Sequence, residues 1–360
     1  MKIVLSRDLA DRVAPDVERI VPGARVVRLG LDGSFDGEPD GVEILLFSVD
    51  LSLTREGMLA ETRVLGAPTL RWVQSPGAGV DHPVWSQLLD RGVRVSRAAG
   101  IAAEPIAQHV FTWILYWERE VARHRAQQAS RTWKIIVSDD LTSKTLGIVG
   151  LGGIGSAAAR VAKAFGMRVI ATRRSDVGDP NVDRLLPPDR LHELLGEAHY
   201  VVLCLPLNAQ TRHAIGAAEL EAMREDAVLV NVARGGVVDE EALIRALRER
   251  RIRGAALDVV SQEPLPASSP LWTLPNCVIT PHDAGYSPRA GERLAALFVE
   301  NLERFARGER LRNGVAKAQV WGTPLRRAGG AGCRPARAAD ARRARAPSRT
   351  TTDRPRPRAP

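Results

Sequence analysis

The stretch that decides the fold is Lys144-Thr145-Leu146-Gly147-Ile148-Val149-Gly150-Leu151-Gly152-Gly153-Ile154-Gly155. A short apolar run ends at Val149, and glycines follow it at the spacing G-x-G-x-x-G. An alanine-rich helical pattern continues over 154–165, and a second apolar run follows at 167–171. The order of strand, glycine turn, helix and second strand is the context that this motif requires. The stretch therefore predicts the first βαβ unit of a doubly wound parallel sheet.

Glycine supplies a different physical property at each position of this turn. Gly150 permits the tight turn, Gly152 lets the backbone approach a pyrophosphate, and Gly155 lets the helix pack closely on the strand. The free N–H groups and the macrodipole at the helix start, around Gly153 and Ile154, favour the anion. We therefore expect these five residues to bind a dinucleotide; the alternative is a glycine-rich turn without a ligand.

The end of the second strand decides which dinucleotide is expected. An Asp or Glu there holds the ribose hydroxyls of NAD, whereas an arginine accommodates the 2′-phosphate of NADP. This chain has Arg173 and Arg174 at that point. NADP is therefore favoured over NAD, with both arginines as candidate ligands. The alternative is that the arginines are solvated and that Asp176 binds the ribose of NAD.

Outside this unit, apolar runs alternate with helical patterns along most of the chain. In the first hundred residues they predict strands at 3–5, 24–29, 41–47, 70–74 and 93–96. Further strands are predicted at 145–149, 167–171, 200–205, 228–232, 254–259 and 278–280. Helices are predicted at 103–126, 154–165, 189–195, 217–223, 240–250 and 288–307.

This alternation predicts an α/β protein of two doubly wound, Rossmann-like domains with a cleft between them. We expect a substrate domain over 1–100, completed by the last helix within 286–315, and a dinucleotide-binding domain over 101–285. The remaining stretch, 316–360, is rich in Arg, Ala, Pro and Gly and has few large apolar residues. We expect it to be a disordered tail.

Net charge separates this tail from the rest of the chain. The 360 residues carry 51 basic and 42 acidic side chains, a formal charge of +9. The stretch 316–360 holds eleven Arg and one Lys against two Asp, or +10, which leaves −1 for 1–315. Binding to nucleic acid is therefore not expected of the folded part. The alternative is a nucleic-acid binder that acts through the tail.

Cysteine content and the length of the apolar runs exclude other classes of protein. Cys204, Cys277 and Cys333 do not stand at metal-ligand spacing, so neither a disulfide framework nor a metal site is expected. No apolar run reaches the roughly 18 residues of a membrane span, and the first residues start a strand rather than a signal peptide. We therefore expect a soluble, cytoplasmic protein without a membrane partner.

Three later segments carry polar residues close to predicted strand ends. They are Val230-Asn231-Val232-Ala233-Arg234-Gly235-Gly236, Asp258-Val259-Val260-Ser261-Gln262-Glu263-Pro264-Leu265-Pro266, and Ile279-Thr280-Pro281-His282-Asp283-Ala284-Gly285. With these segments after the glycine motif, the chain resembles the D-isomer-specific 2-hydroxyacid dehydrogenase family, and within it the glyoxylate and hydroxypyruvate reductases. The resemblance runs from about residue 40 to residue 315, and the ordered Arg, Glu and His are its most specific part.

Reduction of a 2-oxo acid requires a hydride, a proton for the developing alkoxide and a cation for the substrate carboxylate. Arg234 offers a planar fork that binds carboxylate and carbonyl oxygens. His282 is the candidate acid and base, because an imidazole titrates near neutral pH. Glu263 would orient the imidazole and favour its protonated form. The alternatives are a structural ion pair for Arg234, a turn residue before Pro264 for Glu263, and a turn residue before Gly285 for His282.

The resemblance implies further site residues. Backbone N–H groups of Ala78, Gly79 and Val80 would hold the substrate carboxylate; the alternative is a simple strand-to-helix turn. The other cofactor-binding residues that it implies are Leu205, Pro206, Thr211, Val232, Ala233, Asp258 and Gly285. We interpret His109, in the long helix predicted over 103–126, as a packing residue.

The implied activity is that of an NAD(P)-dependent oxidoreductase that transfers a hydride between nicotinamide and a short 2-oxo or 2-hydroxy acid. Glyoxylate or hydroxypyruvate is the expected substrate. One alternative is a phosphoglycerate-type dehydrogenase, and another is a non-catalytic dinucleotide-sensing scaffold. We expect a homodimer, and we interpret Trp133 as a packing residue in the core or at an interface, with substrate contact from a neighbouring subunit as the alternative.

Overall fold

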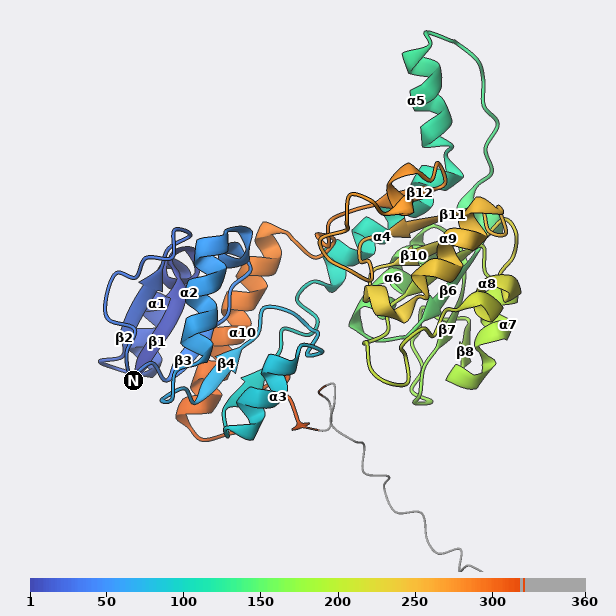
Figure 1. The fold of residues 1–360 in the computed structure, drawn as a ribbon. Helices are drawn as coiled ribbons and strands as arrows, with labels where there is room; N and C mark the ends of the chain where they lie inside the picture. Colours follow the sequence, from blue (N-terminus) through green and yellow to red (C-terminus); the bar gives the residue numbers. More distant parts are fainter. Residues whose placement is uncertain (318–319, 321–360) are drawn as a thin grey trace, which may run out of the picture. The chain divides into compact units, whose positions relative to one another are not determined.

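The structure is a computed structural model that describes residues 1–317 and residue 320. Within them the chain forms two parallel sheets with helices packed on their faces, which make two α/β domains (Figure 1). The doubly wound domains expected from the sequence are therefore confirmed, whereas the tail expected over 316–360 lies, apart from residues 316, 317 and 320, outside the described residues. No helix in the described part is both long and apolar enough to cross a membrane.

The first sheet has the strand order β2-β1-β3-β4-β5. Its strands are β1 (Lys2–Ser6), β2 (Arg25–Leu29), β3 (Ile44–Leu46), β4 (Trp72–Gln74) and β5 (Arg94–Ser96). Its helices are α1 (Arg7–Ile20), α2 (Arg55–Leu65), α3 (Pro83–Asp90) and, from far along the chain, α10 (Pro288–Ala306). Buried aliphatic side chains such as Ile3 and Leu45 pack on both faces, as expected of a parallel sheet that is covered on each side.

α10 packs its apolar face against α1 and the first sheet. Phe298 and Phe305 stack on Trp72 of β4, with ring centroids 5.2 and 5.4 Å from it. Asn301 donates to Gln74 Oε1 at 3.0 Å, which satisfies two polar side chains inside this core. The last helix therefore completes the core of the first sheet.

The second sheet has the strand order β12-β11-β10-β9-β6-β7-β8. Its strands are β6 (Thr145–Val149), β7 (Arg168–Thr172), β8 (Arg184–Leu186), β9 (Tyr200–Leu203), β10 (Val228–Asn231), β11 (Gly254–Leu257) and β12 (Cys277–Ile279). Its helices are α4 (Ala103–Glu118), α6 (Gly153–Ala164), α7 (Leu191–Glu197), α8 (Ala217–Ala222) and α9 (Glu240–Arg248). The strand order reverses between β6 and β9, and sheets of this kind bind ligands outside the carboxyl ends of the strands at such a point.

One predicted helix is wrong. The range 103–126 is divided into α4 and α5 (Val121–Ala129), because Glu120 between them has a left-handed φ of 51°. Arg253 stabilises the break: its guanidinium donates to the Trp117 carbonyl at 2.9 Å and to the Glu120 carboxylate at 3.0 Å. The strand β8, which pairs with β7 at the edge of the second sheet, was not among the predicted strands.

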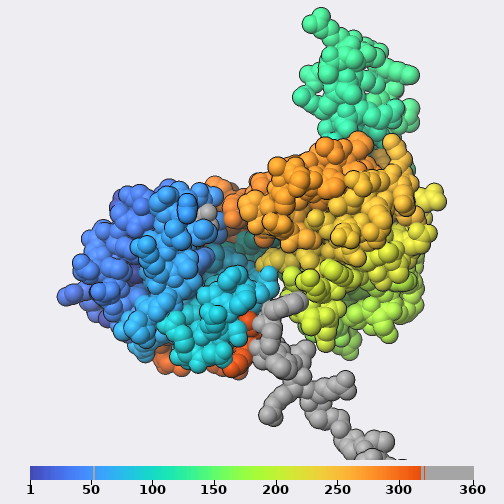
Figure 2. Space-filling model, viewed as in Figure 1, coloured from blue at the N-terminus to red at the C-terminus, as the bar shows by residue number. Residues whose placement is uncertain are grey.

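α5 and the extended residues after it form an arm, which we define as residues 121–137. No residue of α5 is buried. Trp133, Ile135 and Val137 expose 101 %, 84 % and 90 % of their surfaces. Figure 2 shows α5 standing clear of the α/β domain from which it extends. The arm therefore carries large apolar side chains that the described residues of this chain do not bury.

Candidate active site

The glycine turn joins β6 to α6, and its glycines have different surroundings. Gly150 has a φ of +100°, a conformation that residues with a side chain rarely adopt. A Cβ on Gly155 would lie 2.7 Å from the carbonyl oxygen of Gly150, so close packing of helix on strand requires glycine there. A Cβ on Gly152 would meet no atom within 4 Å. The turn is therefore tight on its inner side and open at Gly152.

Gly152 is also the N-cap of α6, and no side chain caps this helix. The first N–H groups of the helix, beginning at Gly153 and Ile154, are therefore available to an acceptor from outside the protein. An uncapped helix start with an open approach is what a pyrophosphate requires. The turn thus fits the dinucleotide that the sequence predicts.

The loop after β7 carries the residues that distinguish NADP from NAD. Arg174 and Asp176 are exposed. Arg173 is half-buried, and its guanidinium donates to the Val177 carbonyl at 3.1 Å. The loop thus offers two cations and one carboxylate to a ribose or its phosphate.

The predicted cofactor residues that follow β9 form a closed loop. Thr211 Oγ1 donates to the Pro206 carbonyl at 2.6 Å, so this hydroxyl has a partner within the loop. Leu205 is half-buried, and its Cδ2 would lie 2.9 Å from a Cβ on Gly150. The loop therefore packs against the glycine turn, which places it beside the expected pyrophosphate.

Three further predicted cofactor residues have neighbours inside the protein. Val232 and Ala233, at the end of β10, are each 6 % exposed, and they pack in two different hydrophobic clusters of the second sheet. Gly285 lies against the residues before α4, because a Cβ on it would approach Ala102 at 3.3 Å. Their side chains therefore have packing roles, and a contact with a cofactor would come mainly from their backbone.

Arg234 follows β10 directly. Its Nη1 donates to the Ala233 carbonyl at 2.7 Å, and its Nε donates to Asp81 at 3.2 Å. Gly79 lies so close to the guanidinium that a Cβ at position 79 would collide with it. Of the other two residues predicted to bind a carboxylate, Ala78 is exposed and the side chain of Val80 is buried in the first domain. The structure thus brings Arg234 to Gly79, with Asp81 as its ion-pair partner.

Gly235 holds the arginine segment against the loop that follows β11. A Cβ on Gly235 would collide with the backbone of Val260 and Ser261, so only glycine permits this approach. Arg234 is therefore near Glu263 and His282. Its positive charge makes a minor contribution that lowers the pKa of both groups, beside the larger effects of burial and of their own hydrogen bond.

Glu263 and His282 form a pair, as the sequence predicts for their positions. His282 Nδ1 and Glu263 Oε2 are 2.7 Å apart, and the other carboxylate oxygen accepts from the Val260 N–H at 3.2 Å. The hydrogen bond to Glu263 raises the pKa of His282 above its ordinary value of 6.5, against the opposing effect of burial. Burial alone would raise the pKa of Glu263, but the hydrogen bond and charge of His282 lower it below its usual range. The pair therefore favours a protonated imidazole next to an ionised carboxylate.

The backbone of His282 has an unusual conformation. Its φ is +57°, in the left-handed region that costs about 1–2 kcal/mol for a residue with a side chain. Its N–H donates to the Asp258 carbonyl at 2.8 Å. Asp258 is 4 % exposed. Its carboxylate accepts from the Thr280 hydroxyl and from the N–H groups of Asp283 and Ala284. Asp258, predicted as a cofactor-binding residue, thus fixes the turn that carries His282.

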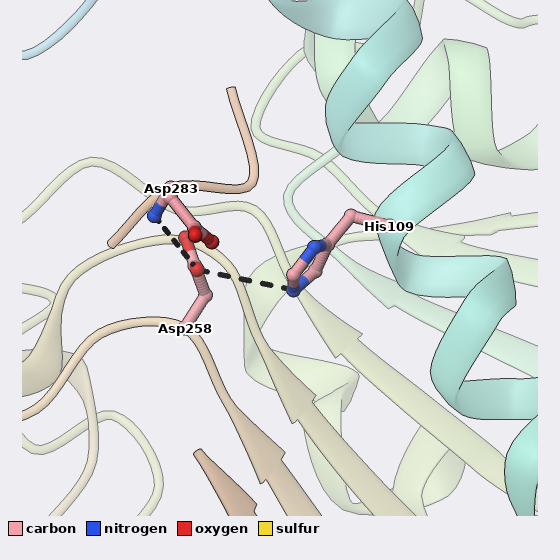
Figure 3. A group of neighbouring side chains, drawn as sticks. All are labelled: His109, Asp258 and Asp283. Carbon is pink, nitrogen blue, oxygen red and sulfur yellow. Dashed lines mark hydrogen bonds and ion pairs between the residues drawn. The ribbon is translucent and has the colours of Figure 1, made fainter. Parts of the chain in front are cut away.

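His109, Asp258 and Asp283 form a cluster in which one ligand-type atom from each lies within 4.8 Å of the others (Figure 3). Trp113 Nε1–H donates to His109 Nε2 at 2.9 Å, and the Asp258 carboxylate already accepts the donors just described. Hydrogen-bond donors therefore already use the lone pair of His109 Nε2 and most of the accepting capacity of the Asp258 carboxylate. We interpret the cluster as a hydrogen-bond network of the loop that carries His282.

Two members of this network were not predicted from the sequence as site residues. His109 was interpreted as packing, and its ring does pack edge-on against Trp113, but its Nε2 also lies 3.1 Å from Thr280 Oγ1 and so makes a polar contact. Thr280 itself carried no signal beyond its place two residues before His282. The spacing of His109 and Trp113, four residues apart on one helix, was the available indication of a side-chain pair.

A family model described as the NAD binding domain of D-isomer specific 2-hydroxyacid dehydrogenases matches residues 111–284. The chain is 38 % identical over 252 residues to a glyoxylate reductase of Korarchaeum cryptofilum, and the match covers 68 % of this chain and 75 % of that relative.

Solved structures agree with the sequence match. A D-isomer specific 2-hydroxyacid dehydrogenase of Xanthobacter autotrophicus, in complex with NADPH, is 30 % identical with a TM-score of 0.71, covering 88 % of this chain and 98 % of that one. The NADPH-dependent glyoxylate/hydroxypyruvate reductase of Sinorhizobium meliloti, in complex with NADP and sulfate, is 26 % identical with a TM-score of 0.71 and the same two coverages.

Proposed function

The chain belongs to the D-isomer-specific 2-hydroxyacid dehydrogenase family, a family of NAD(P)-dependent oxidoreductases, and on this premise we propose that it reduces glyoxylate or hydroxypyruvate with NADPH. The observation that carries the proposal is the pairing of His282 with Glu263 at 2.7 Å beside Arg234. The substrate assignment is supported by the reductases of Korarchaeum cryptofilum and Sinorhizobium meliloti to which the chain is similar.

In this proposal Arg234 binds the substrate. Its planar guanidinium offers parallel N–H groups to the carboxylate and the neighbouring carbonyl oxygen of a 2-oxo acid. Asp81 holds the guanidinium through Nε, which leaves Nη2 free of this ion pair and directed to the segment of Gly79. Backbone N–H groups of residues 78–80 share the carboxylate.

His282 supplies the proton. Glu263 accepts from Nδ1 and so leaves Nε2–H directed to the carbonyl oxygen of the substrate. As the carbonyl carbon receives a hydride, negative charge develops on that oxygen, and the imidazolium gives up its Nε2 proton to form the 2-hydroxy acid. The raised pKa of His282 keeps more of this donor protonated at neutral pH.

The nicotinamide dinucleotide supplies the hydride when bound. The open side of the turn at Gly152 and the uncapped start of α6 bind its pyrophosphate. We propose that Arg173 and Arg174 bind the 2′-phosphate, because a phosphate requires cations and these two follow β7 directly. The complexes of similar proteins with NADPH and NADP support this preference.

A homodimer accounts for the arm. Trp133, Ile135 and Val137 would be buried by a second copy of the chain, and Val121 adds a partly exposed apolar side chain on α5. We expect Ile135→Asp together with Val137→Asp to halve the mass measured by light scattering. If the parent chain is a monomer, or the double variant keeps the mass of the parent, the arm is not the interface.

Steady-state assays test the proposed function. Glyoxylate, hydroxypyruvate, pyruvate, phenylpyruvate and 3-phosphohydroxypyruvate are each assayed with NADPH and with NADH. We expect the highest kcat/KM with NADPH and one of the first two acids. A highest value with the phosphorylated acid would favour the phosphoglycerate-type alternative. Tight dinucleotide binding without turnover of any acid would favour a sensing scaffold.

A further inference from the structure

His109 makes a polar contact between α4 and the loop that carries His282. α4 buries Ala107, Val110 and Ile114 in the core of the second sheet. His109 lies on the adjoining part of this helix, with 17 % of its side chain exposed. Figure 3 shows its ring directed from α4 to Asp258, with Asp283 beyond. A half-buried imidazole is thus placed where the helix meets the catalytic loop.

Thr280 bridges His109 to Asp258. Its Oγ1 lies 3.1 Å from His109 Nε2 and 2.7 Å from Asp258 Oδ1. His109 Nε2 and Asp258 Oδ1 are themselves 3.8 Å apart. Trp113 Nε1–H, which can only donate, approaches the same nitrogen at 2.9 Å, so His109 Nε2 is an acceptor. The single hydroxyl proton of Thr280 is therefore shared between His109 Nε2 and Asp258 Oδ1. The hydroxyl of Thr280 is therefore held between two polar groups whose positions are set from outside the loop.

Asp258 transmits this constraint to His282. Its carboxylate accepts the N–H groups of Asp283 and Ala284, and its carbonyl accepts the N–H of His282. These hydrogen bonds hold the backbone on both sides of His282, whose φ is +57°. A left-handed conformation of this kind persists only where the surrounding structure imposes it. Loss of the anchor at Thr280 would let the turn relax and would move the imidazole away from Glu263.

We infer that His109 is a positioning residue of the reaction: acting through Thr280 and Asp258, it holds His282 where that side chain meets Glu263 and the substrate. The inference rests on the proposed role of His282 as the proton donor. Because a small misplacement of a catalytic group lowers the rate more than it lowers binding, kcat should respond to His109 more than KM.

The central experiment compares three substitutions on α4 in the full-length protein. His109→Leu removes the polar atom, His109→Gln returns an amide near the position of Nε2, and Gln108→Leu makes a similar change at the exposed neighbouring position. We expect His109→Leu to lower kcat about tenfold, the effect of one lost hydrogen bond, with KM for the 2-oxo acid within about threefold. His109→Gln should recover most of kcat, and Gln108→Leu should match the parent.

The pH profile separates positioning from a general loss of stability. If His282 moves away from Glu263, the hydrogen bond that raises its pKa weakens, so kcat of His109→Leu should begin to fall at lower pH than kcat of the parent. A lower melting temperature with an unchanged pH profile would mean that His109 only packs, and would overturn the inference.

A double-mutant cycle tests the route through the hydroxyl. Thr280→Val should lower kcat as His109→Leu does, and the double variant should be no slower than the slower single variant, within about twofold. Multiplying effects would show independent roles and would contradict the route.

His282→Asn separates this inference from the function on which it rests. If His282→Asn retains the activity of the parent, the proposed role of His282 is wrong. If His282→Asn loses activity but His109→Leu behaves like Gln108→Leu, the proposed function stands and the inference about His109 is wrong.

Discussion

Two loops of the second sheet, the turn after β6 and the loop after β12, carry the candidate site, and they are built in opposite ways. The turn after β6 presents backbone: Gly152 has an open flank, and no side chain caps α6. The loop after β12 depends on side chains, because Asp258, Thr280 and Glu263 together fix His282. Side-chain atoms added to the turn should weaken binding of a ligand to its backbone. Removal of a hydrogen-bond partner from the loop should instead move His282. Substitutions that add atoms at one site and remove partners at the other therefore test the difference.

The largest effect is expected at the proton donor. His282→Asn removes the group that we propose protonates the alkoxide, and we expect kcat to fall by roughly 10²–10⁴. Dinucleotide affinity, measured by fluorescence titration, should stay within about threefold, because the glycine turn is untouched. An equal loss of dinucleotide affinity would show that the two sites are not separate.

Two neighbouring glycines form a matched pair for the backbone site. Gly155→Ala puts a Cβ 2.7 Å from a carbonyl oxygen, so we expect the free energy of unfolding to fall by about 1–3 kcal/mol. Gly152→Ala adds its methyl group to open space and should leave thermal stability unchanged while raising the KM for the dinucleotide. Equal melting temperatures for both variants would contradict this division between packing and binding.

Charge at the end of β7 should decide the choice of dinucleotide. Arg173→Asp removes a cation and supplies an acceptor for ribose hydroxyls, so we expect kcat/KM with NADPH to fall about tenfold and that with NADH to rise. Both dinucleotides are measured with the same 2-oxo acid. A parent enzyme that prefers NADH would sink the assignment to NADP.

The smallest effect, a shift rather than a loss, is expected at Glu263. In the proposed mechanism reduction needs protonated His282, so we expect its rate to fall as pH rises through the pKa of His282, which Glu263 holds above 6.5. Glu263→Gln removes that carboxylate and should move the fall in kcat to lower pH, with less effect at pH 6 than at pH 8. An unmoved profile would show that the pair does not control the titration of the imidazole.

The same contrast explains what could be predicted from the sequence. The glycine turn was predictable because its signal is contiguous and each glycine has a local steric cause. Arg234, Glu263 and His282 could be named because their order resembles a known family. The break at Glu120 could not, because Arg253, more than a hundred residues away, stabilises it. The polar role of His109 was hidden for the same reason, since its partner Thr280 lies on another strand end.

The place of α10 has a consequence for the order of synthesis. Ile3 and Leu5 share a buried cluster with Leu297 and Phe298, so the core of the first sheet needs both ends of the folded chain. The strands of the second sheet, from Thr145 to Ile279, are contiguous and leave the ribosome before α10 does. At 5–20 residues per second, the first strand waits roughly 15–60 s for its last helix. The domain begun first is therefore the domain finished last, and α10 cannot cover its apolar N-terminal strands until the rest of the folded chain has been made.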